Sequence, residues 1–431
     1  MLTFALQIYI IMLTLKQIRE GDTLMRLTKK GVDAATAVAQ IIDLDDIRKA
    51  LQTKLDDNLA RQNALAKEIG ELFAQGKRDE AEKAKGRVPE LKESSRKLEA
   101  ELSATEEKVR DLIITLPNLP ADIVPAGRAA EDNEIIRSVE NFPALPADAL
   151  PHWELAKKYD IIDFEVGVKL TGAGFPLYKG KGAALQRALI TYFLDCNIEA
   201  GYTEVMPPVM VNETSGFGTC NLPDKEGQMY YMAADNLYMI PTAEVPVTNI
   251  YRDVIVAESD FPVALTAYTP CFRREAGSYG KDVRGLNRLH QFDKVEIVRI
   301  EHPDRSYRAL DEMVAHVEKI IVSLGLPYRI LRLCGGDMSF ASALTYDFEV
   351  YSAAQQRWLE VSSVSNFETF QSNRLKLRYR GADKKTQLAH TLNGSSLALP
   401  RIVAALLENN QTADGIMIPE ALRRYTGFEK I

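Results

Sequence analysis

The strongest constraint on the fold is a regular apolar rhythm between Asp43 and Leu112, a stretch rich in charge and poor in glycine. Apolar positions recur in steps of four and three residues, the spacing of a helix with a narrow coiled-coil seam. The second half of the seam runs through Val88, Leu91, Ser95, Leu98, Leu102, Thr105, Val109 and Leu112. The first half runs through Leu51, Leu55, Leu65, Ile69 and Leu72, with polar Asn58 and Gln62 at two seam positions. With a turn at Gln75–Asp79, the pattern predicts an antiparallel helical hairpin, each helix of about 28 residues reaching roughly 40 Å.

The outer part of the hairpin carries two helix-breaking residues and many cations. Gly86 and Pro89 predict a kink or a late helix start, because proline removes a backbone hydrogen bond and clashes with the preceding turn. Eight basic and five acidic side chains between 77 and 97 give a local charge of +3. Six of these cations are candidates for contact with RNA phosphates: Lys77, Arg78, Lys83, Lys85, Arg87 and Lys92. Charge alone favours a solvated helical surface with i,i+4 ion pairs instead.

The length of 431 residues predicts two domains, because one hydrophobic core rarely serves so long a chain. A segment with three prolines in nine residues, Pro117–Pro125, runs into a polar stretch and predicts a linker. We therefore expect an arm domain at 12–115, a linker at 116–135 and a second domain at 136–431.

The second domain is expected to be α+β, with a mainly antiparallel sheet flanked by helices. Its strand-like stretches are concentrated between Tyr202 and Ile300 and alternate with helical ones. No glycine-rich phosphate loop or dinucleotide fingerprint follows a predicted strand. A nucleotide site in this chain would therefore need a different architecture.

Bulk properties narrow the class of protein. The net charge of -7 gives no global attraction to nucleic acid, so RNA contacts would need local basic patches. The cysteines Cys196, Cys220, Cys271 and Cys334 form no Cys-x-x-Cys pair, which indicates neither a disulfide framework nor zinc and favours a reducing cytoplasm. The apolar segment Phe4–Leu13 is shorter than the roughly 20 residues of a membrane span, so no membrane role is expected. We interpret residues 1–11 as an apolar N-terminal extension that precedes the arm domain.

Three blocks carry the candidate chemistry. The segment Trp358–Phe367 contains a carboxylate and hydroxyls, and the later segment His390–Arg401 ends in an arginine. Acidic and hydroxyl oxygens suit Mg2+, and a guanidinium can grip phosphate oxygens, so this pair is a candidate Mg-ATP site. Upstream, Cys271–Glu275 and Arg288–Glu296 add cations, an aromatic ring and carboxylates.

These blocks, in this order, resemble the three signature motifs of class II aminoacyl-tRNA synthetases. With Thr242–Glu244 added upstream, the chain resembles the bacterial type of seryl-tRNA synthetase over nearly its whole length, from about Met12. The first class II motif would be the helix at Ala183–Ala200 and the strand that ends at Pro208, which implies a homodimer. Two departures are visible, since Cys220 and Pro400 stand where the family usually has glycine.

The resemblance implies a role for each site residue. Arg273, Glu275 and Arg401 would be catalytic, with Arg273 on the α-phosphate and Arg401 on the outer phosphates. The serine pocket would comprise Thr242, Ala243, Glu244, Arg273, Glu296, Asn393 and Ser395. ATP would contact Arg273, Arg274, Glu275, Arg284, Leu289, Phe292, Glu360, Val361, Ser362, Ser363 and Arg401. Glu360 and Ser363 would hold Mg2+, which requires a bulge or strand end, because residues three apart face opposite sides of a regular strand.

The implied function is attachment of L-serine to tRNA(Ser), and by analogy to tRNA(Sec), through a seryl-adenylate made from ATP. Cations at the hairpin tip would then contact the tRNA. An amino acid:carrier-protein ligase is one alternative, which a long RNA-gripping arm disfavours. A catalytically silent tRNA-binding paralogue is another, and it would be expected to lack one of Arg273, Glu275, Glu360 and Arg401, all of which are present.

Overall fold

The computed structural model describes residues 13–224, 227–275 and 284–431. The described residues divide into two compact units, one of residues 13–28 and 32–117 and the other of residues 29–31 and the described part of 118–431. No helix among the described residues is long and apolar enough to cross a membrane.

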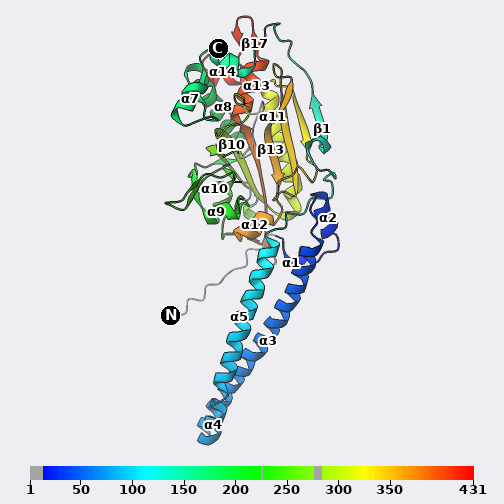
Figure 1. Cartoon of the computed structure of the whole chain (residues 1–431), viewed down its shortest axis with the longest axis vertical. Helices are drawn as coiled ribbons and strands as arrows, with labels where there is room; N and C mark the ends of the chain where they lie inside the picture. Colours follow the sequence, from blue (N-terminus) through cyan, green and yellow to red (C-terminus); the bar gives the residue numbers. More distant parts are fainter. Residues whose placement is uncertain (1–12, 225–226, 276–283) are drawn as a thin grey trace. The chain divides into compact units, whose positions relative to one another are not determined.

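The first unit is a helical hairpin (Figure 1). Its helices are α1 (Leu15–Ile18), α2 (Thr23–Lys29), α3 (Ala35–Ala74), α4 (Arg78–Lys85) and α5 (Val88–Ile113). Helices α3 and α5 pack side by side and antiparallel, as the seam predicted. The break before α5 confirms the late helix start, and proline occupies the first turn of α5, where its missing N–H costs no helical bond.

The polar seam positions of the hairpin bond to one another. Asn58 Nδ2 donates to Leu91 O and Ser95 Oγ, each at 3.0 Å. Gln62 Nε2 donates to the same two acceptors at 3.1 and 2.6 Å. Buried polar groups without partners would destabilise the hairpin, so this cluster explains how the seam tolerates two amides.

The second unit is built on an eight-stranded sheet. In spatial order the strands are β1 (Glu134–Val139), β11 (Tyr328–Arg332), β12 (Leu344–Ser352), β13 (Arg357–Asn366), β16 (His390–Ala398), β10 (Gln291–Glu301), β9 (Val263–Phe272) and β4 (Thr203–Glu204). Every pairing is antiparallel except that of β4 with β9. The fold class is therefore α+β as predicted, whereas the expected concentration of strands between Tyr202 and Ile300 is wrong, because β11, β12, β13 and β16 form half of the sheet.

The predicted linker also belongs in part to this unit. Asn118 is buried, and its Nδ2 donates to Ala341 O and Phe367 O at 2.8 Å each. Strand β1 begins within the predicted linker and pairs with β11. Proline-rich composition alone did not distinguish a free connector from a segment packed along a domain.

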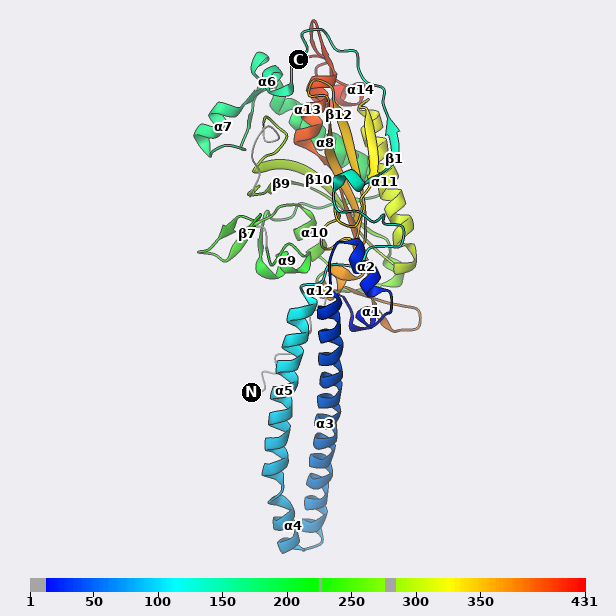
Figure 2. The ribbon, with the colours of Figure 1, turned by 45° about the vertical axis from the view of Figure 1, so that its right-hand side comes forward.

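Helices surround the sheet (Figures 1 and 2). They are α6 (His152–Lys158), α7 (Phe164–Leu170), α8 (Gly180–Glu199), α9 (Glu213–Gly218), α10 (Glu244–Asn249), α11 (Ser306–Ser323), α12 (Phe370–Leu375), α13 (Leu399–Asn409) and α14 (Glu420–Thr426). Short strands complete the unit: β2 (Ile162–Asp163), β3 (Leu177–Tyr178), β5 (Met210–Asn212), β6 (Tyr231–Met232), β7 (Leu237–Met239), β8 (Ile255–Ala257), β14 (Arg378–Arg380), β15 (Thr386–Leu388), β17 (Gln411–Thr412) and β18 (Gly415–Ile416).

The two faces of β10 have different environments. Val295 and Ile297 belong to the main core together with residues of α8, α11 and α13. Val298 packs instead with Ala243 and Val247, next to and within α10. Because side chains alternate along a strand, Glu296 shares the face of Val298 and points toward the α10 side.

Candidate active site

The predicted serine-pocket residues converge on the face of the sheet that α10 covers. Thr242 and Ala243 are buried just before α10, and Glu244 is its first residue. Glu296 lies directly opposite Ser395 in the pairing of β10 with β16. Asn393 lies opposite Val298, two residues further along and therefore on the same face. Three distant segments of the chain thus contribute to one small polar pocket.

A buried ion pair lies at the base of this pocket. Lys294 Nζ lies 2.6 Å from Glu296 Oε2 and donates to Thr242 Oγ1 at 2.8 Å. Thr242 Oγ1 in turn donates to Glu296 Oε2 at 3.2 Å. Glu296 therefore combines an ion pair with Lys294 and a position in the predicted serine pocket.

Glu244 is the carboxylate of the pocket without a cationic partner among the described residues. Its Oε1 accepts a hydrogen bond of 2.6 Å from Gln371 Nε2, and Gln371 Oε1 accepts one of 2.8 Å from Thr391. Burial, and secondly the negative charge of Glu296, raise the pKa of Glu244 to about 7. Nearby, the Asn393 side chain is buried, and its contact with Glu244 opposes the rise of that pKa, although Nδ2 forms no hydrogen bond of ordinary geometry in the described part of the chain. The pocket therefore lacks a cation for Glu244.

Gln371 was not predicted as a site residue. It lies on α12, just outside the motif segment Trp358–Phe367, and it is fully buried. A single glutamine in a short, mostly buried helix has no distinctive spacing. Its role became visible only when the fold placed α12 beside α10.

Arg273 extends from the end of β9 toward the same pocket. Its Nε donates to Pro241 O at 3.3 Å, next to Thr242, and its guanidinium lies 5.3 Å from the centre of the Phe292 ring. Arg274 is exposed and lies over the Tyr230 ring at 5.6 Å. Arg273, the predicted α-phosphate ligand, thus lies near both the predicted serine pocket and Phe292, a predicted ATP contact.

Glu275 and Leu289 have different surroundings from those expected. Glu275 adopts a positive φ of 48° and forms an ion pair with Arg288, a cation that was noted in the motif but not assigned a role. Leu289 is buried in the main core, so only its backbone is available to a ligand. Arg288 is therefore an additional candidate for phosphate binding.

Arg401 and Glu360 meet at the other end of the site. Arg401 lies in the first turn of α13 and donates from Nε to Asn287 O at 3.0 Å and from Nη1 to Glu360 O at 2.8 Å. The Glu360 carboxylate lies 3.6 Å from Arg401 Nη1. The structure therefore joins the predicted phosphate arginine to the predicted metal ligand.

The bulge required for joint coordination by Glu360 and Ser363 is present. Glu360 pairs with Glu349 whereas Ser362 pairs with Phe348, so Val361 is an extra residue in β13. Val361 is buried in the core, and Ser362 Oγ donates to Ser395 O at 2.5 Å. The bulge thus changes the alternation of β13 between the two predicted ligands.

Asp347 is an acidic neighbour that the sequence analysis missed. It pairs with Ser363 across β12 and β13, and Ser363 hydrogen-bonds to its carboxyl group. Burial and the charge of Glu360 raise the pKa of Asp347 well above its usual value. Its Oδ1 has no hydrogen-bond partner among the described residues. No three His, Cys, Asp or Glu side chains form a metal-binding cluster in residues 13–224, 227–275 and 284–431.

Arg284 lies apart from the other predicted ATP contacts. Its guanidinium is 4.7 Å from the Trp153 ring, and its Nη2 donates to Glu154 Oε1 at 3.3 Å. Both partners belong to the first turn of α6. In this structure Arg284 therefore contacts α6 rather than Arg401 or Arg273.

The two departures from the family pattern differ in how well they suit the local backbone. Cys220 has φ of 71°, a left-handed conformation in which glycine is favoured, and burial raises the pKa of its thiol to about 12. Pro400 lies in the first turn of α13, where proline is well tolerated. Neither residue displaces a charged group of the site.

The candidate tRNA-binding cations of the first unit are exposed. They are Lys77, Arg78, Lys83, Lys85, Arg87 and Lys92. Lys85 pairs with Glu82 at 3.3 Å, and the other five form no salt bridge within the described residues. Most of this local positive charge is therefore available to an anionic partner.

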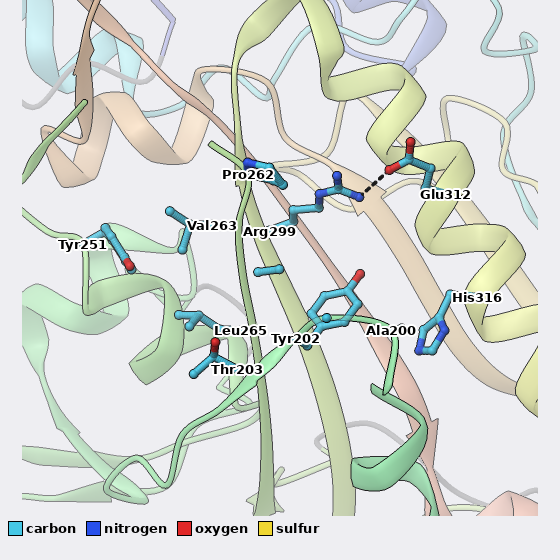
Figure 3. Close-up of a pocket in the computed structure, with 12 residues that line it drawn as sticks. Ala200, Tyr202, Thr203, Tyr251, Pro262, Val263, Leu265, Arg299, Glu312 and His316 are labelled. Carbon is cyan, nitrogen blue, oxygen red and sulfur yellow. Dashed lines mark hydrogen bonds and ion pairs between the residues drawn. The ribbon is translucent and has the colours of Figure 1, made fainter. Parts of the chain in front are cut away.

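A cavity of about 610 Å³ lies away from these residues (Figure 3). Its lining includes Ala200, Tyr202 and Thr203 from the end of α8 onward, and Arg299, which bonds to Glu312 at 2.8 Å. None of the predicted catalytic, serine or ATP residues lines it. The cavity therefore belongs to the region of the first class II motif and not to the candidate active site.

Comparisons with known proteins agree with this arrangement. Residues 12–120 match the seryl-tRNA synthetase N-terminal domain, and residues 230–410 match the tRNA synthetase class II core domain (G, H, P, S and T). The serine–tRNA ligase of Salinibacter ruber is 51% identical over 407 residues, covering 94% of this chain and 95% of the relative. That of Methylacidiphilum infernorum is 46% identical over 421 residues, covering 96% and 99%.

A solved structure gives the same result for the three-dimensional fold. The crystal structure of seryl-tRNA synthetase from Pyrococcus horikoshii complexed with ATP superposes with a TM-score of 0.91 at 31% identity, covering 97% of this chain and 99% of that one. By sequence, domain content and fold, the chain belongs to the serine–tRNA ligase family of class II aminoacyl-tRNA synthetases.

Proposed function

We propose that this chain attaches L-serine to tRNA(Ser) in two steps, with ATP as co-substrate. In the first step a serine carboxylate oxygen attacks the α-phosphorus of ATP, which forms seryl-adenylate and releases pyrophosphate. In the second, a terminal ribose hydroxyl of the tRNA attacks the acyl carbon and AMP leaves. The observation that carries the proposal is the buried polar cluster of Thr242, Glu244 and Glu296, with Arg273 bonded to the adjacent Pro241.

The pocket has the groups that serine recognition requires. Glu244 in its ionised form would bind the ammonium group, since the other pocket carboxylate, Glu296, is already paired with Lys294. Asn393 and Ser395 would hydrogen-bond to the substrate hydroxyl, which distinguishes serine from alanine because a missing hydroxyl leaves buried polar groups unpaired. Ala243 and the close packing around Val298 limit the space for a larger side chain.

The remaining residues would position ATP for in-line attack. Arg273 would bind the α-phosphate, Phe292 would stack on adenine, and Arg401 would neutralise the outer phosphates. Arg288, which forms an ion pair with Glu275, would be a further phosphate contact. Adenylyl transfer depends mainly on such positioning and charge neutralisation, so the site needs no dedicated acid or base.

The residues beside Arg401 fit a magnesium ion. Glu360 and Ser363 supply hard oxygen ligands, and the buried, unbonded Oδ1 of Asp347 lies beside them. When bound with ATP, Mg2+ would neutralise phosphate charge. Glu360 and Ser363 would hold the ion, and Arg401 would keep the Glu360 backbone in place.

The helical hairpin would supply the grip on tRNA. The exposed cations near its tip are positioned to contact RNA phosphates, and by analogy tRNA(Sec) would be a second substrate where it exists. We place the reaction in the cytoplasm, where translation occurs. The free cysteines of the described chain are compatible with a reducing compartment.

We further propose a homodimer formed through the first class II motif. Strand β4 is the last strand of the sheet, and Met206, two residues after it, is 88% exposed. An exposed apolar group next to a sheet edge indicates an interaction surface. Light scattering should give the mass of a dimer, and Met206→Glu should shift the equilibrium toward monomer. A monomeric parent chain at micromolar concentration would contradict this assignment.

The test of function is pyrophosphate exchange into ATP with each of the twenty amino acids, with and without tRNA. Exchange driven by serine alone, without tRNA, is the expected result. Charging of tRNA(Ser) with labelled serine then tests the second step. A folded, Mg2+-supplied chain that is silent with all twenty amino acids would instead support the silent tRNA-binding paralogue.

A further inference from the structure

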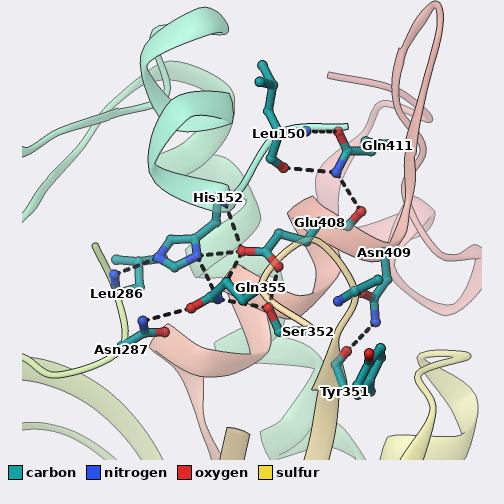
Figure 4. A network of polar contacts seen from close by, with 11 residues as sticks. Leu150, His152, Leu286, Asn287, Tyr351, Ser352, Gln355, Glu408, Asn409 and Gln411 are labelled. Carbon is teal, nitrogen blue, oxygen red and sulfur yellow. Dashed lines mark hydrogen bonds and ion pairs between the residues drawn. The ribbon is translucent and has the colours of Figure 1, made fainter. Parts of the chain in front are cut away.

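A buried polar network lies behind the ATP site, outside every residue assigned so far (Figure 4). At its centre are His152, the first residue of α6, and Glu408 near the end of α13, whose side chains are fully buried. His152 Nδ1 lies 2.7 Å from Glu408 Oε1, and the backbone N–H of His152 donates to the same oxygen at 2.9 Å. Ser352 Oγ donates to Glu408 Oε2.

The hydrogen bonds give the two ring nitrogens of His152 different partners and favour the ionised form of Glu408. The backbone N–H of Leu286 donates to His152 Nε2 at 2.8 Å, so Nε2 carries the lone pair and Nδ1 carries the proton. Burial opposes ionisation of Glu408, but the hydrogen bonds from His152 and Ser352 outweigh it and hold its pKa below the usual value. The His152 ring thus bridges a buried carboxylate and one backbone amide.

A second branch of the network reaches Asn287, the residue after Leu286. Gln355, in the turn between β12 and β13, donates from Nε2 to Glu408 Oε1 at 3.0 Å and to Ser352 Oγ at 2.8 Å. Asn287 Nδ2 donates to Gln355 Oε1 at 2.9 Å. Leu286 and Asn287 are therefore held by two adjacent contacts, one to the backbone and one to a side chain, and both lead to Glu408.

The network ends at the predicted phosphate arginine. The carbonyl oxygen of Asn287 accepts the 3.0 Å hydrogen bond from Arg401 Nε, and Arg401 Nη1 bonds to Glu360 O. Gly285 confirms how tightly this segment approaches α6, because a Cβ there would lie 2.2 Å from His152 Nε2. The segment that orients Arg401 is thus fixed against α6 by contacts that use no substrate atom.

We propose that His152, Glu408, Gln355 and Asn287 form a positioning network that holds Arg401 in the orientation for the outer phosphates of ATP. The proposal rests on the function proposed above, in that it assigns Arg401 to those phosphates. The network affects nucleotide binding through the Asn287 carbonyl and makes no contact of its own with the serine pocket. Its loss should therefore weaken ATP binding while it leaves AMP binding, which lacks the outer phosphates, nearly unchanged.

Two variants interrupt different branches. His152→Asn keeps a donor near Nδ1 for Glu408 but loses the acceptor for the Leu286 amide. Gln355→Met keeps the side-chain volume in a partly exposed turn but releases Asn287. His390→Gln is the matched control, because His390 Nδ1 also bonds to a buried serine, Ser306 Oγ at 2.7 Å, but leads to no site residue.

Titration calorimetry of the full chain with Mg-ATP, AMP and serine is the test. We expect the Kd for ATP to rise about tenfold in His152→Asn and about fivefold in Gln355→Met, the effect of one or two lost hydrogen bonds. The Kd values for AMP and serine should change less than about twofold, and His390→Gln should resemble the parent. In an Arg401→Ala background neither network variant should weaken ATP binding further, because the group they position is gone.

Each alternative outcome overturns the proposal. Equal weakening of ATP and AMP, or additive losses in the Arg401→Ala background, would show a general structural role. Unchanged ATP binding in folded variants would show no role. If His152→Asn does not fold, the same measurements on Gln355→Met, alone and combined with Arg401→Ala, test the proposal. A parent chain that lacks serine-dependent exchange refutes the proposed function, whereas the ratio of ATP to AMP affinity still tests the network.

Discussion

The raised pKa of Glu244 predicts that serine recognition depends on pH near neutrality. Burial and the charge of Glu296 raise this pKa to about 7, and only the ionised carboxylate attracts the serine ammonium group. With a pKa of about 7, roughly nine tenths of Glu244 is ionised at pH 8 and roughly one tenth at pH 6. The kcat/KM for serine should therefore fall about tenfold between pH 8 and pH 6, since this constant reports the free enzyme.

The assay is serine-dependent pyrophosphate exchange at saturating ATP, measured at several pH values between 6 and 8. Glu244→Gln should have a low kcat/KM for serine that no longer changes in this range. Glu165→Gln, which alters an exposed carboxylate on α7, should keep the parent profile. A parent kcat/KM that is equal at pH 6 and pH 8, or a Glu244→Gln variant with the parent slope, would refute the role given to Glu244.

The same pKa has a consequence for stability. Because the folded-state pKa of about 7 exceeds the ordinary value of 4.5, the folded state binds this proton more tightly than the unfolded state does. The contribution of Glu244 to the free energy of unfolding is therefore full below pH 4.5 and is lost as pH rises to about 7. The melting temperature of Glu244→Gln minus that of the parent should therefore be higher at pH 8 than at pH 5. An equal difference in melting temperature at both pH values would contradict the assignment.

Three further predictions concern separate parts of the chain. Arg401→Ala should lower serine-dependent exchange by about 10²–10³-fold, as loss of a charge-stabilising group does, and should leave tRNA binding in a filter assay largely intact; equal loss of both would contradict the separation of roles. Deletion of residues 45–112 should abolish tRNA binding and leave serine-dependent exchange largely intact. Loss of exchange in a folded dimer would refute the modular organisation. Asp347→Asn and Glu360→Gln should each weaken binding of Mn2+ with ATP, measured by electron paramagnetic resonance, and unchanged binding would remove these carboxylates from the metal site.

Local sequence patterns predicted much of this protein correctly. The four-three rhythm predicted the hairpin of α3 and α5, because a helical seam depends on the spacing of residues within each helix. The motif blocks led to the family through Arg273, Glu296, Glu360 and Arg401. The need for a bulge between Glu360 and Ser363 followed from strand alternation and from the shared Mg2+ role that the resemblance implied, and the register of β12 and β13 shows a bulge there.

Other features depended on contacts between distant segments. The pattern around Glu296 did not reveal that Ser395 lies opposite it, because strand order and register are long-range properties. Gln371, Asp347 and the pair of His152 with Glu408 carry no local signal, since a buried polar residue looks like an exposed one until its partner is known. The sequence by itself thus determined the helices, the family and most of the charged groups. Only the tertiary structure decided which of those groups are neutralised, which are buried without partners, and which hold Arg401, because burial and pairing arise when segments far apart in the chain pack together.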